Sequence, residues 1–213
     1  MLIRHRGAAP TVDPSAYVAP TATLVGDVRV GPRARVMYGA VVDAEASRVT
    51  VGECAIVCEQ AVLRATAAGS QEWPVQVADH VFVGPHATLL GCRVGRCAYL
   101  ATCATVLQGA RLGDGASIAV GGLVHAGAVV PGGFFLPPGL VAVGDPARPY
   151  GPDDPAALTD AIRSVGFARL AFGVEAAFED RIARYEASAE VRSAEFAAHR
   201  DDQVLRDEDG HDR

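Results

Sequence analysis

The sequence predicts a mainly β protein, a parallel β-helix followed by a helical segment. Two observations carry this prediction. Aliphatic residues recur at intervals of six between Val12 and Leu136, and a small residue, most often alanine, usually stands two positions before each of them. The composition agrees, because the 213 residues include 23 glycines and only 6% aromatic side chains. A core of Val, Leu, Ile and Ala suits a narrow, repetitive structure.

The period of six is neither the 3.6 of a helix nor the simple alternation of an ordinary strand. It fits a triangular coil in which each hexad supplies one short strand and one corner, with its aliphatic residue pointing to the axis. Three hexads close a coil, and the coils stack as parallel strands about 4.8 Å apart. Breaks in phase predict insertions at 43–50 and 64–76. The expected inward positions are Val12, Val18, Leu24, Val30, Val36, Val42, Val51, Val57, Leu63, Val77, Val83, Leu89, Val94, Leu100, Val106, Leu112, Ile118, Val124, Val130 and Leu136.

Three segments follow from these patterns. The β-helix is expected over residues 1–150, and a helical segment over 151–200, where apolar residues recur at spacings of three to five. Gly166 and Gly173 permit a bend, and the helix is expected to pack along the β-helix of its own or a neighbouring subunit. Residues 201–213 are rich in acids, and we expect a disordered acidic tail.

Charge and cysteine content limit the partners and the compartment. The formal net charge of −6 argues against nucleic acid or an anionic membrane as partner. No apolar run follows the first residues, so neither a signal peptide nor a membrane span is expected. Five cysteines without a CxxC pair are typical of free thiols in a reducing compartment. We therefore expect a cytoplasmic protein.

Three stretches resemble the γ-class carbonic anhydrases of the hexapeptide-repeat superfamily. They are GAVVDAEASRVTVGECAIVCEQAVLR (39–64), VADHVFVGPHATLLGCRVG (77–95) and LPPGLVAVGDPARP (136–149). The resemblance implies a single-stranded, left-handed parallel β-helix and a homotrimer. The outward apolar residues Leu90, Leu107 and Phe134 are candidates to be covered by a partner subunit.

The resemblance also implies where zinc would bind, through three histidines shared between two subunits. The corresponding residues here are Arg64, Pro85 and Leu90. Arginine does not deprotonate to become a ligand, and the other two side chains have no donor atom. The sequence therefore predicts no metal, no other cofactor and no ordinary carbonic anhydrase activity, which needs a metal-bound hydroxide.

His86 lies next to one of the lost zinc positions, and the repeat register decides its place. Val83 and Leu89 must both face the axis, so no slip by one residue is available. We expect His86, and His80 one hexad earlier, at corners of the coil rather than on a strand face.

Charged residues replace the family's pocket. Asp43 and Glu45 stand where the family has the arginine and aspartate of its Arg-Gly-Asp motif, and Cys58 and Glu59 where it has a Gln-Asp pair. Counting hexads in threes places Asp43 and Arg64 side by side on one outward face, next to Leu90. An exposed ion pair would contribute little to stability, whereas carboxylates beside an arginine can perform acid–base chemistry or grip a carboxylate substrate. The candidate catalytic residues are Asp43, Glu45, Cys58, Glu59 and Arg64.

A second group is expected to line the cleft and contact substrate. It comprises Trp73, His86, Leu90, Tyr99 and Thr102. Trp73 lies in the inserted loop before a proline, where a packing role is the alternative.

Three functions remain open. The first is a metal-independent lyase, isomerase or cyclase acting on a small molecule at a subunit interface. The second is a non-catalytic scaffold or assembly subunit, for which the helix and tail would dock partners. The third is an acyltransferase with His125 as its base, because His125 follows the inward Val124 and points outward.

Overall fold

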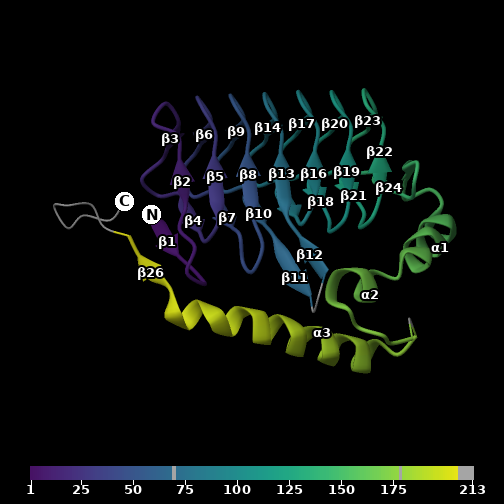
Figure 1. Ribbon diagram of the computed structural model, residues 1–213. Coiled ribbons are helices and arrows are strands. Elements are labelled where there is room, and N and C mark those ends of the chain that lie inside the picture. Colours follow the sequence, from purple (N-terminus) through teal and green to yellow (C-terminus); the bar gives the residue numbers. More distant parts are fainter. Residues whose placement is uncertain (69–70, 178, 206–213) are drawn as a thin grey trace.

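The computed structural model describes residues 1–68, 71–177 and 179–205, and it confirms a left-handed parallel β-helix with helices after it (Figure 1). Three sheets form the sides of the coil. The first is ten-stranded and contains β1 (Leu2–Arg4), β4 (Thr23–Val25), β7 (Val41–Asp43), β10 (Val62–Arg64), β15 (Thr88–Leu90), β18 (Thr105–Val106), β21 (Leu123–Val124), β24 (Val141–Val143), β25 (Arg148–Tyr150) and β26 (Gln203–Val204).

The other two sheets have seven strands each. One contains β2 (Thr11–Val12), β5 (Val28–Val30), β8 (Val49–Val51), β13 (Val75–Val77), β16 (Arg93–Val94), β19 (Arg111–Leu112) and β22 (Val129–Val130). The other contains β3 (Tyr17–Val18), β6 (Arg35–Val36), β9 (Ile56–Val57), β14 (Phe82–Val83), β17 (Tyr99–Leu100), β20 (Ser117–Ile118) and β23 (Phe135–Leu136). The hairpin of β11 (Thr66–Ala68) and β12 (Gln71–Trp73) lies in the expected insertion.

The hexad register is confirmed by burial. Every expected inward position from Leu24 to Leu136 is buried, whereas Val12 and Val18 in the first coil are only half-buried. Burying a leucine or valine contributes about 1.5–3 kcal/mol, so the axis is the main source of stability. His80 and His86 adopt φ of 59° and 58° at exposed corners, as the register predicts.

The C-terminal segment is three helices rather than one bent helix. These are α1 (Pro155–Val165), α2 (Phe167–Phe172) and α3 (Arg181–Phe196), and the 3-10 helix η1 (Ala197–Asp201) continues α3. Gly166 ends α1 at φ 62°, a left-handed conformation that favours glycine and closes the helix with its amide bonded to Arg163. Gly173 ends α2 in the same way. None of the helices in the described part of the chain is long and apolar enough to cross a membrane.

The tail is more ordered than its composition suggests. Residues 201–205 were expected to be disordered, yet Ile3 of β1 pairs with Val204 of β26 in antiparallel register, and the Leu205 amide donates to the Leu2 carbonyl at 2.8 Å. The rest of the predicted tail, 206–213, lies outside the described residues. Helix α3 therefore runs back along the coil to β1 and lies over the ten-stranded sheet (Figure 1). We call this sheet the covered face.

Candidate functional site

The covered face carries one continuous column of outward side chains. Strand pairing stacks Asp43 on Arg64 and Arg64 on Leu90, so the predicted neighbours are confirmed. The same register adds to this column the residue that follows β18 and the residue that follows β21. Its members are Val25, Asp43, Arg64, Leu90, Leu107 and His125.

Asp43, Glu45 and Arg64 form a charged group on this column. Arg64 Nη2 lies 3.3 Å from Asp43 Oδ2, and Arg64 Nε lies 3.7 Å from Glu45 Oε1. Asp43 Oδ1 accepts a hydrogen bond from the Glu45 amide at 2.9 Å, which fixes the turn after β7. The predicted pair of Asp43 and Arg64 does face outward from the coil, but Asp43 and Glu45 are only 2% and 3% exposed. They are buried because the chain's own C-terminal segment covers them.

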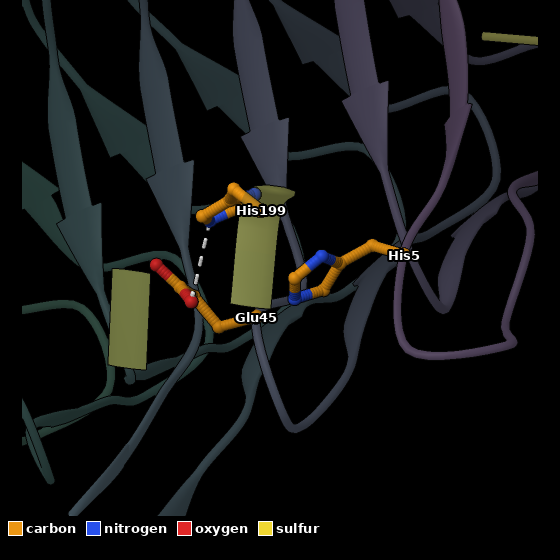
Figure 2. A group of neighbouring side chains, drawn as sticks. All are labelled: His5, Glu45 and His199. Carbon is orange, nitrogen blue, oxygen red and sulfur yellow. Dashed lines mark ion pairs between the residues drawn. The ribbon is translucent and has the colours of Figure 1, made fainter. Parts of the chain in front are cut away.

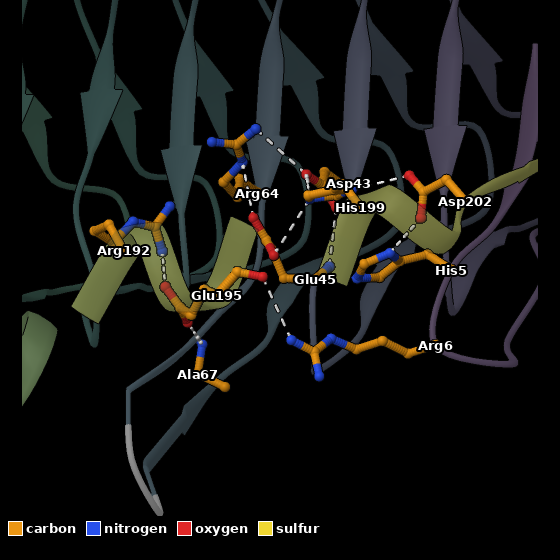
Figure 3. Close-up of polar contacts among 10 residues, drawn as sticks. All are labelled: His5, Arg6, Asp43, Glu45, Arg64, Ala67, Arg192, Glu195, His199 and Asp202. Atoms are coloured by element: carbon orange, nitrogen blue, oxygen red, sulfur yellow. Dashed lines mark hydrogen bonds and ion pairs between the residues drawn. The ribbon is translucent and has the colours of Figure 1, made fainter. Parts of the chain in front are cut away.

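Two histidines and a third carboxylate complete the cluster. His199 of η1 places Nε2 3.5 Å from Glu45 Oε2 and 3.8 Å from Asp43 Oδ2. Asp202 accepts hydrogen bonds from both imidazoles, from His5 Nδ1 at 2.6 Å and from His199 Nδ1 at 2.9 Å. The two rings stack with centroids 4.3 Å apart. We call Asp43, Glu45, Arg64, His5, His199 and Asp202 the buried cluster (Figure 3).

Aromatic and polar contacts hold α3 and η1 against the buried cluster. Phe196 lies between two guanidinium groups, with Arg64 5.1 Å and Arg192 4.5 Å from its ring centroid. Each cation–π contact contributes about 0.5–1 kcal/mol at such partly exposed sites. Glu195 forms an ion pair with Arg192 and accepts a hydrogen bond from the Ala67 amide at 3.1 Å. The segment is thus attached to β10 and β11 as well as to β1.

Burial and neighbouring charge alter the protonation of the cluster. Burial raises the pKa of Glu45, and the adjacent Asp43 carboxylate raises it further. Burial lowers the pKa of His199, but the hydrogen bond to Asp202 and the charges of Asp43 and Glu45 outweigh it, so the pKa of His199 is raised overall. Neither Glu45 oxygen has a hydrogen-bond partner among the residues that the structure describes. A carboxyl and an imidazole that face each other at 3.5 Å can exchange a proton.

Apart from Leu90, which stacks on Arg64, the other residues predicted to be catalytic or to bind substrate lie elsewhere. The amide of His86 donates to the carbonyl of Glu59, and the amide of Cys103 donates to that of Pro85, so Glu59, His86 and Thr102 share one corner of the coil. Cys58 is buried beside Glu59, and burial raises the pKa of its thiol, which opposes a thiolate role. Neither Cys58 nor Glu59 has a hydrogen bond or ion pair to the buried cluster among the residues that the structure describes.

Tyr99 and Trp73 are also apart from the cluster. Tyr99 lies on a seven-stranded sheet, 49% exposed and stacked on Phe82. Trp73 packs on the turn at Gly109, where a Cβ would lie 3.0 Å from the indole ring. Its environment matches the packing alternative.

Three residues of the buried cluster were missed by the sequence reasoning. His5 precedes the first recognisable hexad, and His199 and Asp202 lie at or beyond the end of the predicted helix. No periodic pattern marks them. The pairing of β26 with β1 brings them together.

A separate cavity of about 570 Å³ lies under the helices near the far end of the same column. Phe167, Phe172, Arg169 and Arg181 line it together with His125. His125 packs edge-on against Phe167, and its Nδ1 is buried without a partner. Burial lowers the pKa of His125, which keeps the imidazole neutral and able to accept a proton.

The three residues that the sequence resemblance assigns to zinc positions, Arg64, Pro85 and Leu90, do not fit zinc. Arg64 is held by two carboxylates, and Pro85 and Leu90 offer no donor atom. No chemical step at those positions can therefore be assigned to a zinc ion.

No family model matches the chain, but several known proteins are similar to it over about half of its length. It is 36% identical over 112 residues to gamma carbonic anhydrase 3, mitochondrial, of Arabidopsis thaliana, covering 49% of this chain and 43% of the relative. Gamma carbonic anhydrase 1 of the same plant is 32% identical over 116 residues, covering 51% and 42%. The chain thus spans about two-fifths of the length of these relatives.

Among solved structures, a hexapeptide transferase family protein from Anaplasma phagocytophilum aligns over 90% of this chain and 96% of its own. The TM-score is 0.58 at 22% sequence identity. This likeness supports the fold alone.

Proposed function

We propose that this chain, a γ-carbonic-anhydrase-like protein with the hexapeptide-repeat fold, is an enzyme that performs acid–base chemistry on a small molecule at its buried cluster. One observation carries the proposal. Asp43 and Glu45 are almost completely buried side by side, facing both the Arg64 guanidinium and the His199 imidazole. Burying two carboxylates is unfavourable unless they are paired, and such arrangements cluster at functional sites.

The residue types suit a lyase or isomerase acting on a small carboxylic acid. The Arg64 guanidinium matches the geometry of a substrate carboxylate. Asp43 Oδ2 and His199 Nε2 lie 3.8 Å apart, so one of these groups can accept a proton from a substrate and the other can return it. The family's zinc would have no role in this reaction.

Substrate access requires the C-terminal segment to move. η1 and the end of α3 cover the cluster, and the contacts that hold them include those of Phe196 with two arginines, the Glu195 bond to the Ala67 amide and the Asp202 bonds to both histidines. An interface made mostly of polar side-chain contacts is typical of segments that open locally. We propose that this segment is a lid.

We also propose that the chain is a homotrimer. The sequence expected Leu90, Leu107 and Phe134 at the subunit interface, but Leu90 and Leu107 lie on the covered face and Phe134 packs partly against the core. The better support is the β3–β23 sheet, whose outward column includes Tyr17, Tyr99 and Phe135 at 40%, 49% and 58% exposure. All five cysteines are free thiols, which is consistent with a cytoplasmic location.

The direct test is turnover of small hydroxy-, amino- and keto-acids by the full chain, followed by NMR. We expect at least one to be converted, and we expect Arg64→Gln and Asp43→Asn to lower kcat/KM by about 100-fold or more. Asp27→Asn is the matched control, because Asp27 is also a carboxylate paired with arginines but lies outside the cluster. Full activity in both cluster variants would refute the proposal, and a complete lack of turnover would favour the scaffold alternative.

A second candidate function is acyl transfer at the His125 cavity. The specific observation in its favour is the neutral, unpartnered imidazole in the wall of a cavity that also holds arginines and aromatic rings. Such a base can activate an acceptor amine or hydroxyl, while the arginines bind an anionic acyl carrier. Calorimetry with acetyl-CoA tests binding in the cavity, and an assay of acetyl transfer to an amine or hydroxyl acceptor tests the chemistry. Acetyl transfer that persists in His125→Asn would exclude His125 as the base.

A further inference from the structure

The buried cluster contains three side chains with the chemistry and placement of metal ligands. His5 follows β1, Glu45 follows β7, and His199 lies in η1, so the three come from distant parts of the chain (Figure 2). One ligand atom from each lies within 4.8 Å of the others. We infer that His5, Glu45 and His199 form a binding site for a divalent transition-metal ion, with zinc the best match.

The two histidines are held in the tautomer that a metal requires. Asp202 accepts the Nδ1 hydrogen of both rings, at 2.6 Å and 2.9 Å. When the imidazoles are neutral, each Nε2 therefore carries the lone pair that a metal needs. A carboxylate bonded to the outer nitrogen of a ligating histidine is the usual arrangement around protein-bound zinc, because it orients the ring and increases its basicity. Here one carboxylate does this for two rings.

Unsatisfied polar atoms point to a missing partner at this position. The His5 side chain is completely buried, and its Nε2 has no hydrogen-bond partner within the described part of the chain. Both oxygens of Glu45, whose side chain is 1% exposed, also lack one. Leaving buried polar atoms unsatisfied costs about 1–3 kcal/mol each. A cation between them would satisfy three such atoms at once.

The charge balance and the geometry agree with a divalent ion. With both imidazoles neutral, the six residues of the buried cluster hold three carboxylates and one guanidinium, that of Arg64, so the cluster carries excess negative charge. Two imidazoles and one carboxylate are a ligand set used by catalytic zinc and by non-haem iron. Bonds of about 2.1 Å place tetrahedral ligand atoms about 3.4 Å apart, so the side chains must draw together by roughly 1 Å.

This site differs from the one that the family resemblance implies. All three ligands belong to one subunit, and none occupies the positions of Arg64, Pro85 or Leu90. The sequence prediction of no metal considered those three positions and the nearby His86 and His80. The inference shares the cluster with the proposed reaction but does not depend on it, because metal binding is measured without substrate.

The test uses the full chain stripped with a chelator and titrated with Zn²⁺ by calorimetry and with Co²⁺ by absorption. We expect about one ion per chain and a rise in Tm with Zn²⁺. Glu45→Gln and His199→Gln should each weaken binding at least tenfold, in line with the loss of one of three ligands. His80→Asn, at an exposed corner whose positive φ asparagine tolerates, should bind normally.

X-ray absorption of the zinc-loaded wild type keeps the test independent of how the variants fold. We expect a shell of nitrogen and oxygen with imidazole scattering and without sulfur. A sulfur shell would place the ion at a cysteine and overturn the inference, as would unchanged affinity in the folded His199 variant. An absence of Zn²⁺ and Co²⁺ binding by the wild type would leave the cluster as a salt-bridge network with a protonated His199, and would also overturn it.

Discussion

The cost of removing Arg64 measures how strongly the buried cluster depends on its only guanidinium. Arg64→Ala would leave Asp43 and Glu45, 2% and 3% exposed, facing each other without that counter-charge. Breaking a buried pair in this way costs about 3–5 kcal/mol. The Arg64 side chain is 29% exposed, which lets water screen part of the charge, so we expect about 3 kcal/mol. For a chain of this length that corresponds to a fall in Tm of about 6–12 °C.

Arg48, which stands just before β8, is a matched control that carries the same charge but is less buried. Arg48 forms a shorter pair with Asp27, 2.6 Å, but its side chain is 48% exposed, so Arg48→Ala should cost less than about 1 kcal/mol. Both variants are compared by urea unfolding at one chain concentration, since association would add to the apparent stability. Asp43→Asn added to Arg64→Ala should recover about 1–2 kcal/mol. Equal costs for Arg64→Ala and Arg48→Ala would refute the account of the cluster.

Three further predictions concern the rest of the coil. Because burial lowers the pKa of His125, its contribution to the free energy of unfolding should be constant above the ordinary histidine pKa of about 6.5 and should be lost as pH falls below it. Urea unfolding between about pH 7.5 and 5 should therefore show a smaller loss of stability in His125→Asn than in the wild type. Leu100 is fully buried and the adjacent Tyr99 is 49% exposed. Leu100→Ala should therefore lower the free energy of unfolding by about 2–5 kcal/mol and Tyr99→Ser by under about 1 kcal/mol. A register shifted by one residue would reverse this contrast. Phe135 is 58% exposed on the proposed trimer face, so Phe135→Asp should lower the mass measured by light scattering to that of a monomer. A variant that stays trimeric would show that the interface does not include Phe135.

The repeat explains why so much of the coil was predictable. A period of six fixes which residue of each hexad points inward, and any slip would turn every side chain of a strand to the other side. The contact between Asp43 and Arg64 and the corner position of His86 follow from that register alone. Both were predicted correctly.

The buried cluster was only half predictable because its other half is not periodic. His5 lies before the first clear hexad, and His199 and Asp202 reach it only after three helices have turned back along the coil. The angle of that return depends on the turns at Gly166 and Gly173 and on single contacts such as Phe196 with Arg64. Acidic composition around Asp202 predicted disorder, but pairing of Val204 with Ile3 outweighs it.

Both proposals require the C-terminal segment to be docked on the covered face, and backbone hydrogen exchange measures this most directly. The Leu205 and Ala67 amides donate hydrogen bonds at 2.8 Å and 3.1 Å across this junction. We expect peptides spanning 196–205 to exchange far more slowly than an unstructured chain, and to slow further when Zn²⁺ is added. Exchange at the rate of a free peptide would show that His199 and Asp202 are not at the cluster, and would contradict the account at its centre.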